Sequence, residues 1–275
     1  MGIAYAGQSD NLVHRRYCTK VGLKSGPTTW CGAIYMSVVC SLIDQLHEFE
    51  SPLVAEAMDA MDCPGIGECY MSRNIRQMTA QSQPMVGIAM LLETDTSSRG
   101  GERDNMALME LMESMGDNPT PYAIVMKAIG ARPEHECIVG DGMVKIAAAA
   151  GCIGFVTDGG IRDLEGIDRE GMPVFAAGAA TAHSSFMIRR PQGPIEIGGA
   201  QVNEGDLLHG DINGLQIIPK ACHQGIVEAC ILSREFETRA HVFGRRSDKT
   251  CRQKRQNTQK LYADHQARCR KLLAK

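Results

Sequence analysis

Apolar and polar residues have two kinds of spacing along this chain: some segments have the period of an α-helix, and others alternate as in a β-strand. Within Ser41–Met61 apolar residues recur with helical spacing, and Ser51-Pro52 divides the segment into two helices, with Ser51 as N-cap and Pro52 as first helical residue. The apolar run Gln83–Leu92 predicts a buried strand, and the Met-rich segment Asp104–Met115 predicts a helix. The first half of the chain therefore mixes both kinds of element.

The second half predicts shorter elements, mostly strands. The expected elements are a helix or turn at Tyr122–Ala128, strands at Cys137–Val139, Cys152–Thr157 and Val174–Ala177, a helix at Met143–Ala150, and a final helix at Gln224–Arg239. Before that final helix, a meander of half-buried strands runs from Ile195 to Ile218, with turns at Asn203-Glu204-Gly205 and Asn213-Gly214. Helices and strands mixed around one core predict an α/β fold.

Charge divides the chain into an acidic body and a basic end. The segment Arg245–Lys275 holds eleven Lys/Arg and two Asp, a net charge of +9, so residues 1–244 carry −12 of the total −3. We expect an N-terminal extension over 1–40, polar and broken by Gly and Pro, a catalytic domain over 41–244 and a basic tail over 245–275. The tail can contact RNA, an anionic surface or the acidic body; a solvated helix or frayed terminus is the alternative.

Composition limits the class of protein further. A chain of 275 residues with 44% hydrophobic content can bury a core. The eleven cysteines are odd in number, form no C-x-x-C pair, and several lie in apolar segments, so we expect reduced thiols and no zinc site. The stretch Cys31–Ile43 is too short to span a bilayer and too deep for a clean signal peptide. We expect a cytoplasmic protein without membrane contact, with secretion as the alternative.

The segment Val139–Glu165, VGDGMVKIAAAAGCIGFVTDGGIRDLE, contains the candidate chemistry. Gly140-Asp141-Gly142 allows a ligand to approach the backbone and opens a helix whose first amides, those of Gly142 and Met143, attract anions. Arg162 offers a planar fork for carboxylates, and Asp163 is a hard oxygen ligand for a divalent cation. With the spacing D-x20-R-D, from Asp141 to Arg162-Asp163, these parts predict a site for a small dicarboxylate or a 2-oxo acid on a metal ion. It is not a dinucleotide fingerprint, because the third glycine is missing.

This segment is similar to the family of the regulator of ribonuclease activity A, which includes the metal-dependent 4-hydroxy-4-methyl-2-oxoglutarate aldolases. The likeness extends to MPVFAAGAAT and IEIGGAQVNEGDLLHGDINGLQIIP, begins weakly near Leu42 and fades near Arg239. The resemblance implies a swivelling β/β/α domain, in which helices flank a layered mixed sheet. It also implies a homotrimer or hexamer with each site near a subunit boundary.

The resemblance implies cleavage of a C–C bond of a 4-hydroxy-2-oxo acid to pyruvate, with oxaloacetate decarboxylation as a side activity, and these residues are compatible with it. Asp163 would bind Mg²⁺ or Mn²⁺, and Arg162 would hold the 2-oxo oxygen as charge develops there. The turn from Gly140 and the amides of Gly142 and Met143 would hold the substrate carboxylate, while Asp141 would orient a water that moves protons. The loop Thr94–Arg103 is the expected wall around the far end of the substrate.

One position departs from the family pattern, and the identity of one further site residue is undecided. The family has an acid where this chain has Gly166; Glu165 substitutes for it, or a water-holding contact is absent. The aldolases also use a Glu from a neighbouring subunit, for which Glu235 and Glu237 are the candidates.

Other functions and residues receive simpler interpretations. The alternative to a lyase is a non-catalytic regulator that binds a ribonuclease or RNA. A methyltransferase is disfavoured because no loop suits S-adenosylmethionine. His183 and His209 belong to no ligand-spaced cluster, so we interpret them as hydrogen-bonded scaffold residues.

Overall fold

The computed structural model describes residues 39–100, 103–116, 118, 120–183 and 186–273. The expected N-terminal extension, residues 1–40, lies almost wholly outside the described residues. The compact unit considered below begins at Val39.

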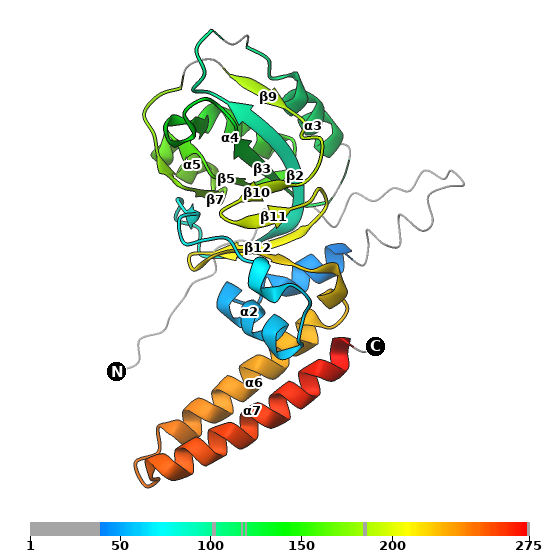
Figure 1. The fold of residues 1–275 in the computed structure, drawn as a ribbon, viewed down its shortest axis with the longest axis vertical. Helices are drawn as coiled ribbons and strands as arrows, with labels where there is room; N and C mark the ends of the chain where they lie inside the picture. Colours follow the sequence, from blue (N-terminus) through cyan, green and yellow to red (C-terminus); the bar gives the residue numbers. More distant parts are fainter. Residues whose placement is uncertain (1–38, 101–102, 117, 119, 184–185, 274–275) are drawn as a thin grey trace, which may run out of the picture. The chain divides into compact units, whose positions relative to one another are not determined.

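A mixed eight-stranded sheet forms the centre of this unit (Figure 1). Its strands, in spatial order, are β1 (Arg76–Gln77), β7 (Val174–Ala176), β5 (Cys152–Thr157), β3 (Tyr122–Ala128), β2 (Met85–Asp95), β12 (Leu207–Asp211) and β13 (Gly214–Ile218), with β9 (Met187–Arg189) also paired to β2. The four strands from β7 to β2 are parallel, and the outer pairs are antiparallel. The sheet nearly closes, because the Met71 amide donates to the Leu215 carbonyl at 2.9 Å and the Ile217 amide to the Cys69 carbonyl at 2.7 Å.

Two smaller sheets complete the β structure. Strands β4 (Cys137–Val139), β6 (Gly160–Ile161) and β8 (Gly178–Ala179) are parallel, and β10 (Ile195–Ile197) pairs with β11 (Ala200–Val202) in a hairpin. Parallel strands end at the same edge of their sheet. The residues after β4, β6 and β8 therefore meet at one edge, which is where the candidate site lies.

Helices and sheets enclose three apolar cores. One core lies between the sheet and the helices α3 (Met106–Gly116), α4 (Asp141–Ala149) and α5 (Leu164–Glu170), and the second joins the sheet to β10 and β11. The third lies among a helix at residues 39–46, α2 (Ser51–Ala60), α6 (Ile226–Gly244), α7 (Cys251–Leu273) and the ends of β12 and β13. Short 3₁₀ turns lie at η2 (Ile66–Glu68), η3 (Pro133–His135) and η4 (Lys220–Cys222).

Most expected elements are confirmed, and so is the α/β class with its layered mixed sheet and flanking helices. The strands at Cys137–Val139 and Cys152–Thr157 have the predicted bounds, and α4 begins two residues before the predicted Met143. The Met-rich helix α3 buries Leu108, Leu111, Met112 and Met115 in the core.

The prediction of a helix or turn at Tyr122–Ala128 is wrong, because this segment is strand β3. It lies between β2 and β5 in the parallel part of the sheet. Such a strand is covered on both faces, so its apolar residues run continuously and do not alternate. The sequence pattern that normally marks a strand is consequently missing.

The helix at 224–239 is not the final one. It ends at Gly244, and the basic tail continues as the 23-residue helix α7, which packs against α6. His265, Cys269 and Leu272 are the buried residues of α7. Their spacing of four and three residues is helical, and it is the signal that could have found this helix in an otherwise polar sequence.

The expected cap of α2 is also wrong. The N-cap is Glu50, without a side-chain hydrogen bond, and Ser51 is the first helical residue. The Ser51 side chain instead approaches a buried histidine, since its Oγ lies 3.0 Å from His209 Nδ1.

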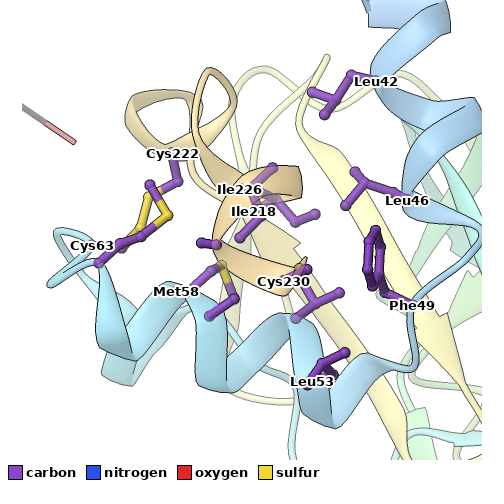
Figure 2. Close-up of a cluster of buried hydrophobic side chains, with 14 of the residues drawn as sticks. Leu42, Leu46, Phe49, Leu53, Met58, Cys63, Ile218, Cys222, Ile226 and Cys230 are labelled. Carbon is purple, nitrogen blue, oxygen red and sulfur yellow. A yellow bond between two sulfur atoms is a disulfide. The ribbon is translucent and has the colours of Figure 1, made fainter. Parts of the chain in front are cut away.

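The cysteines are not all reduced. Cys63 after α2 and Cys222 in η4 form a disulfide, with their Cα atoms 6.3 Å apart (Figure 2). Both lie in the core of α2, α6 and α7, and 159 positions of sequence separate them, so spacing gave no sign of the pair. Seven other described cysteines are free thiols. Among the described helices, none combines the length and apolar character needed to cross a bilayer.

Candidate metal and anion site

The residues after β4 and β6 pack directly on one another. The Arg162 amide donates to the Val139 carbonyl at 3.0 Å, which sets the register of this edge. A Cβ added to Gly140 would lie 3.2 Å from Asp163 Oδ2 and 3.5 Å from Arg162 Nε. Gly140 thus lets a carboxylate and a guanidinium of the same chain lie against bare main chain.

Asp163 has an unusual backbone. Its φ of 61° and ψ of 39° are left-handed, a conformation that only Asn and Asp adopt with some ease among residues with a side chain. It occupies the N-cap of α5, where its carbonyl accepts hydrogen bonds from the amides of Gly166 and Ile167. Its side chain makes no capping bond, and Oδ2 lies 3.4 Å from Arg162 Nε, with both side chains nearly half exposed. The carboxylate is therefore available to a ligand.

Asp141 lies in the first turn of α4 and is held by a lysine. Lys145 Nζ donates to Asp141 Oδ2 at 2.6 Å. This hydrogen bond is the main cause that lowers the pKa of Asp141, with smaller contributions from the Gly142 amide and Arg162. Asp141 is consequently an ionised hydrogen-bond acceptor at neutral pH.

The structure leaves no room for a side chain at position 166, where the family has an acid. A Cβ on Gly166 would lie 2.8 Å from Asp141 Cβ and 2.9 Å from its Oδ2, so any side chain here would displace Asp141. The Glu165 side chain is 95% exposed and pairs with Arg169 at 3.7 Å. The geometry therefore favours the alternative in which the water-holding contact is absent, and not the one in which Glu165 replaces the missing acid.

The donor atoms at this edge suit a hard cation that keeps most of its water. In the part of the chain that the structure describes, no three His, Cys, Asp or Glu side chains gather at metal-binding distance. Mg²⁺ commonly uses one or two carboxylates and retains several waters, whereas a structural zinc site needs four protein ligands. Asp163, the open backbone at Gly140 and the neighbouring Arg162 fit the first kind of site.

A hollow of about 640 Å³ adjoins this edge. It is lined by Thr96, Ser97, Arg132, Glu134, His135 and residues 179–183. The Ala180 amide donates to the carbonyl of Ile161, the residue before Arg162, at 2.8 Å. The buried Cys137 thiol lies between the hollow and the Arg162–Asp163 edge. Its Sγ is 3.8 Å from the Ala180 carbonyl, and its pKa, raised mainly by burial, is also affected by the charges of Arg162 and Asp163.

A buried glutamate fixes one wall of the hollow. Glu136 accepts hydrogen bonds from the Thr96 amide and hydroxyl and, at 2.7 Å, from the Ser97 hydroxyl. The loop after β2 was expected to form a substrate wall, and Thr96 and Ser97 do line the hollow. Arg132 and His135 were missed, since neither belongs to a recognisable motif.

The two singled-out histidines lie apart. His209 is fully buried, 3.0 Å from Ser51 Oγ and 3.2 Å from the Leu46 carbonyl, so its prediction as a scaffold residue is confirmed. His183 lines the hollow and packs edge-on against Phe186, with ring centroids 4.7 Å apart.

The two glutamates expected to serve a neighbour's site both lie on α6. Glu235 accepts from Arg239 at 3.3 Å and from Arg268 of α7 at 3.2 Å. Glu237 lies near Glu56 of α2, whose pKa is raised first by burial and then by this neighbouring charge. Helix α6 packs on α2 and α7 and not on α4 or α5, so neither glutamate belongs to its own chain's Arg162–Asp163 edge (Figure 1).

These features define an α/β protein with a nearly closed mixed sheet and an Arg-Asp pair set against a glycine turn. The family model described as RraA-like, Aldolase/RraA, matches residues 54–217, and the chain belongs to this family. The family includes proteins named as 4-hydroxy-4-methyl-2-oxoglutarate aldolases and as ribonuclease inhibitors.

Three similar proteins illustrate this range. A Halalkalibacterium halodurans protein named "Putative 4-hydroxy-4-methyl-2-oxoglutarate aldolase" is 29% identical over 192 residues, covering 68% of this chain and 81% of its own. Protein DlpA of Legionella pneumophila is 26% identical over 216 residues, which are 78% of this chain and 33% of DlpA. The crystal structure of Streptomyces coelicolor RraAS2, described as an unusual member of the RNase ES inhibitor RraA protein family, superposes with a TM-score of 0.58 at 22% identity, covering 73% of this chain and 96% of RraAS2.

Proposed function

We propose that this chain is a divalent-metal-dependent lyase that cleaves a C–C bond of a 4-hydroxy-2-oxo acid to release pyruvate, and that it also decarboxylates oxaloacetate. The observation that carries the proposal is the left-handed Asp163, whose carboxylate leaves its own helix uncapped and lies against Gly140 beside Arg162. A left-handed non-glycine residue costs on the order of 1–3 kcal/mol and is concentrated at functional sites. The carboxylate orientation that results suits ligand binding better than helix capping.

Each residue then has a defined part. Asp163 would hold Mg²⁺ or Mn²⁺, which when bound supplies Lewis acidity toward the 2-oxo group. Arg162 stabilises the negative charge that develops on the 2-oxo oxygen when the C–C bond breaks, for retro-aldol cleavage and for decarboxylation alike. The helix-start amides of Gly142 and Met143 would bind the substrate carboxylate, and the ionised Asp141 would accept a hydrogen bond from the water that carries protons.

The substrate's far end would extend toward the hollow. That region adjoins Arg162 through the hydrogen bond between Ala180 and Ile161, and Arg132 and His135 give it cationic and imidazole groups. A 2-oxo acid with a polar or anionic distal part fits this lining better than an apolar one. The chain is further proposed to form a homotrimer or hexamer, with Glu235 or Glu237 of a neighbour completing the site.

Pyruvate release from oxaloacetate and from a panel of 4-hydroxy-2-oxo acids, measured with and without metal, tests the proposal. Activity should require Mg²⁺ or Mn²⁺, and Asp163→Asn should lower kcat/KM at least about tenfold, or about 1.4 kcal/mol of barrier. Arg162→Lys keeps the charge but loses the planar fork, so it should keep metal affinity and lose turnover.

Two results would contradict the proposal. Full activity in excess EDTA would show that no metal is needed. No activity on any of these substrates with metal present would favour the non-catalytic regulator that binds a ribonuclease.

A further inference from the structure

Helix α7 lies beyond the part of the chain that the family match explains. The match ends at residue 217, and α7 begins at Cys251. Its Lys and Arg residues are Arg252, Lys254, Arg255, Lys260, Arg268, Arg270 and Lys271, and its one acidic residue is Asp264. Nothing in the proposed lyase mechanism uses this charge.

The packing of α7 separates an inner from an outer face. His265, Cys269 and Leu272 are buried, and α7 contacts α6 and α2 through that side. At 3.6 residues per turn, Arg252, Lys260, Arg270 and Lys271 lie on the opposite side of the helix, and all four are exposed. With a rise of 1.5 Å per residue, this outer face of α7 is about 28 Å long.

The charges on the outer face are not neutralised within the described chain. Arg268, at the edge of the face, pairs with Glu235 at 3.2 Å. Among the described residues, no ion pair involves Arg252, Lys260, Arg270 or Lys271. The acidic body therefore leaves this row of charges available to a partner.

We propose that the outer face of α7 binds the phosphate backbone of a nucleic acid, without sequence preference. Lysine and arginine release condensed counterions when they meet phosphates, which is a favourable and salt-dependent contribution. Between the basic residues the face carries Gln256 and Gln259, both exposed, which can donate to phosphate and sugar oxygens. No aromatic residue lies on this face, so bases have nothing to stack on, and duplexes should bind at least as well as single strands.

The same composition disfavours other partners. A helix that lies on a membrane inserts an apolar face, but the apolar residues Cys269 and Leu272 are already buried in the protein core. Protein interfaces usually depend on buried aromatic or aliphatic anchors, and the outer face offers only charge, amide and the small side chains of Ala263 and Ala267.

Fluorescence anisotropy with labelled duplexes and single strands of both RNA and DNA, titrated at several salt concentrations, tests this proposal. Binding should weaken steeply with salt. The outer-face variant with all four basic residues changed to Gln should bind at least about tenfold more weakly at low salt, with its log–log salt slope reduced by about 3 to 4. Substitution is preferable to deletion of the tail, because deletion would also remove Cys269 and Leu272 from the core.

A matched variant controls for net charge. It removes four positive charges from exposed sites elsewhere, with the changes Arg73→Gln, Arg76→Gln, Arg169→Gln and Lys220→Gln. It should bind nearly as the parent does, and thermal unfolding should show both variants folded.

Several outcomes would overturn the proposal. Unchanged nucleic-acid binding by the outer-face variant, or an equal loss of binding in both variants, would each contradict it. So would a parent protein that binds only anionic vesicles. A further contradicting result is a parent that binds no nucleic acid but whose sedimentation changes when the outer-face residues are substituted. The last result would show that the face is a contact between copies of this chain.

Discussion

At the level of single residues, the missing side chain at position 140 brings the candidate ligands together. Gly140 has extended backbone angles, φ −134° and ψ 172°, that any residue can adopt. Glycine is therefore needed at this position because of the space around it, and not because of its backbone angles. A methyl group here would press on Asp163 Oδ2 at 3.2 Å while leaving the backbone unstrained.

Changing Gly140→Ala should weaken the proposed metal site while leaving the fold stable. The added methyl would displace the Asp163 carboxylate by a few tenths of an ångström, and we expect Mg²⁺ or Mn²⁺ affinity to fall several-fold, as calorimetric titration would show. Gly178→Ala is the matched control, since a Cβ there has no atom within 4 Å. Equal affinities in both variants would argue that Asp163 is not the ligand.

His209 should make stability depend on pH. Burial is the main cause that lowers its pKa from 6.5 to about 4. Its pKa in the folded state is below that in the unfolded state, so the neutral form is favoured by folding, and the stability it contributes is present above pH 6.5 and lost as pH falls toward 4. The loss is at most about 3 kcal/mol. Denaturant unfolding from pH 7 to 4 should show this decline, and His209→Gln should flatten it; identical profiles would contradict the assignment.

Among the helices and strands, the pattern of burial decides which elements can be predicted from the sequence. The edges and hairpins were predictable because Ile195, Ile197 and Val202 alternate with exposed residues. Strand β3 was not, since burial on both faces removes the alternation. In sequence, helix α7 resembles a polar tail because its three buried residues are few among many charges, although their spacing is helical.

Helix α7 should stabilise the fold through Leu272. This side chain is buried, and its Cβ lies close enough to Gly225 that a Cβ there would be only 2.8 Å away. Leu272→Ala should lower the free energy of unfolding by roughly 2–4 kcal/mol, as urea titration would measure. Leu261→Ala, a half-buried position on the same helix, should cost clearly less. A negligible effect at position 272 would instead support a solvated tail.

At the scale of the whole molecule, the residues of the candidate site could be grouped from the sequence, but neither the strand that brings them together nor their surroundings could be predicted. The sequence grouped Asp141, Arg162 and Asp163 by their spacing, but it did not predict strand β6, which precedes Arg162 and pairs with β4. The carboxyl ends of these two parallel strands share an edge and bring the three residues together. The contact of Gly166 with Asp141 and the hollow beside Ala180 depend on segments distant in sequence, and no local pattern encodes such contacts.

Assembly can be tested by mixing two defective forms. If a neighbour's α6 completes each site, Asp163→Asn chains and chains with both Glu235→Gln and Glu237→Gln should each be inactive alone. Unfolded together and refolded, they should regain part of the activity, because some sites then combine intact halves. Sedimentation should show a trimer or hexamer throughout. A monomer with full activity would exclude a shared site.

The disulfide between Cys63 and Cys222 turns most of this chain into a closed ring with two free arms. Every strand of the described sheets and the whole Gly140–Asp163 edge belong to the ring, whereas α2, α6 and α7 belong to the arms. Both arms leave the ring at the disulfide, and their helices α2, α6 and α7 pack on one another around it. If a protease cut any loop of the ring once, the disulfide would still join the two pieces, so the denatured chain would separate into fragments only after reduction.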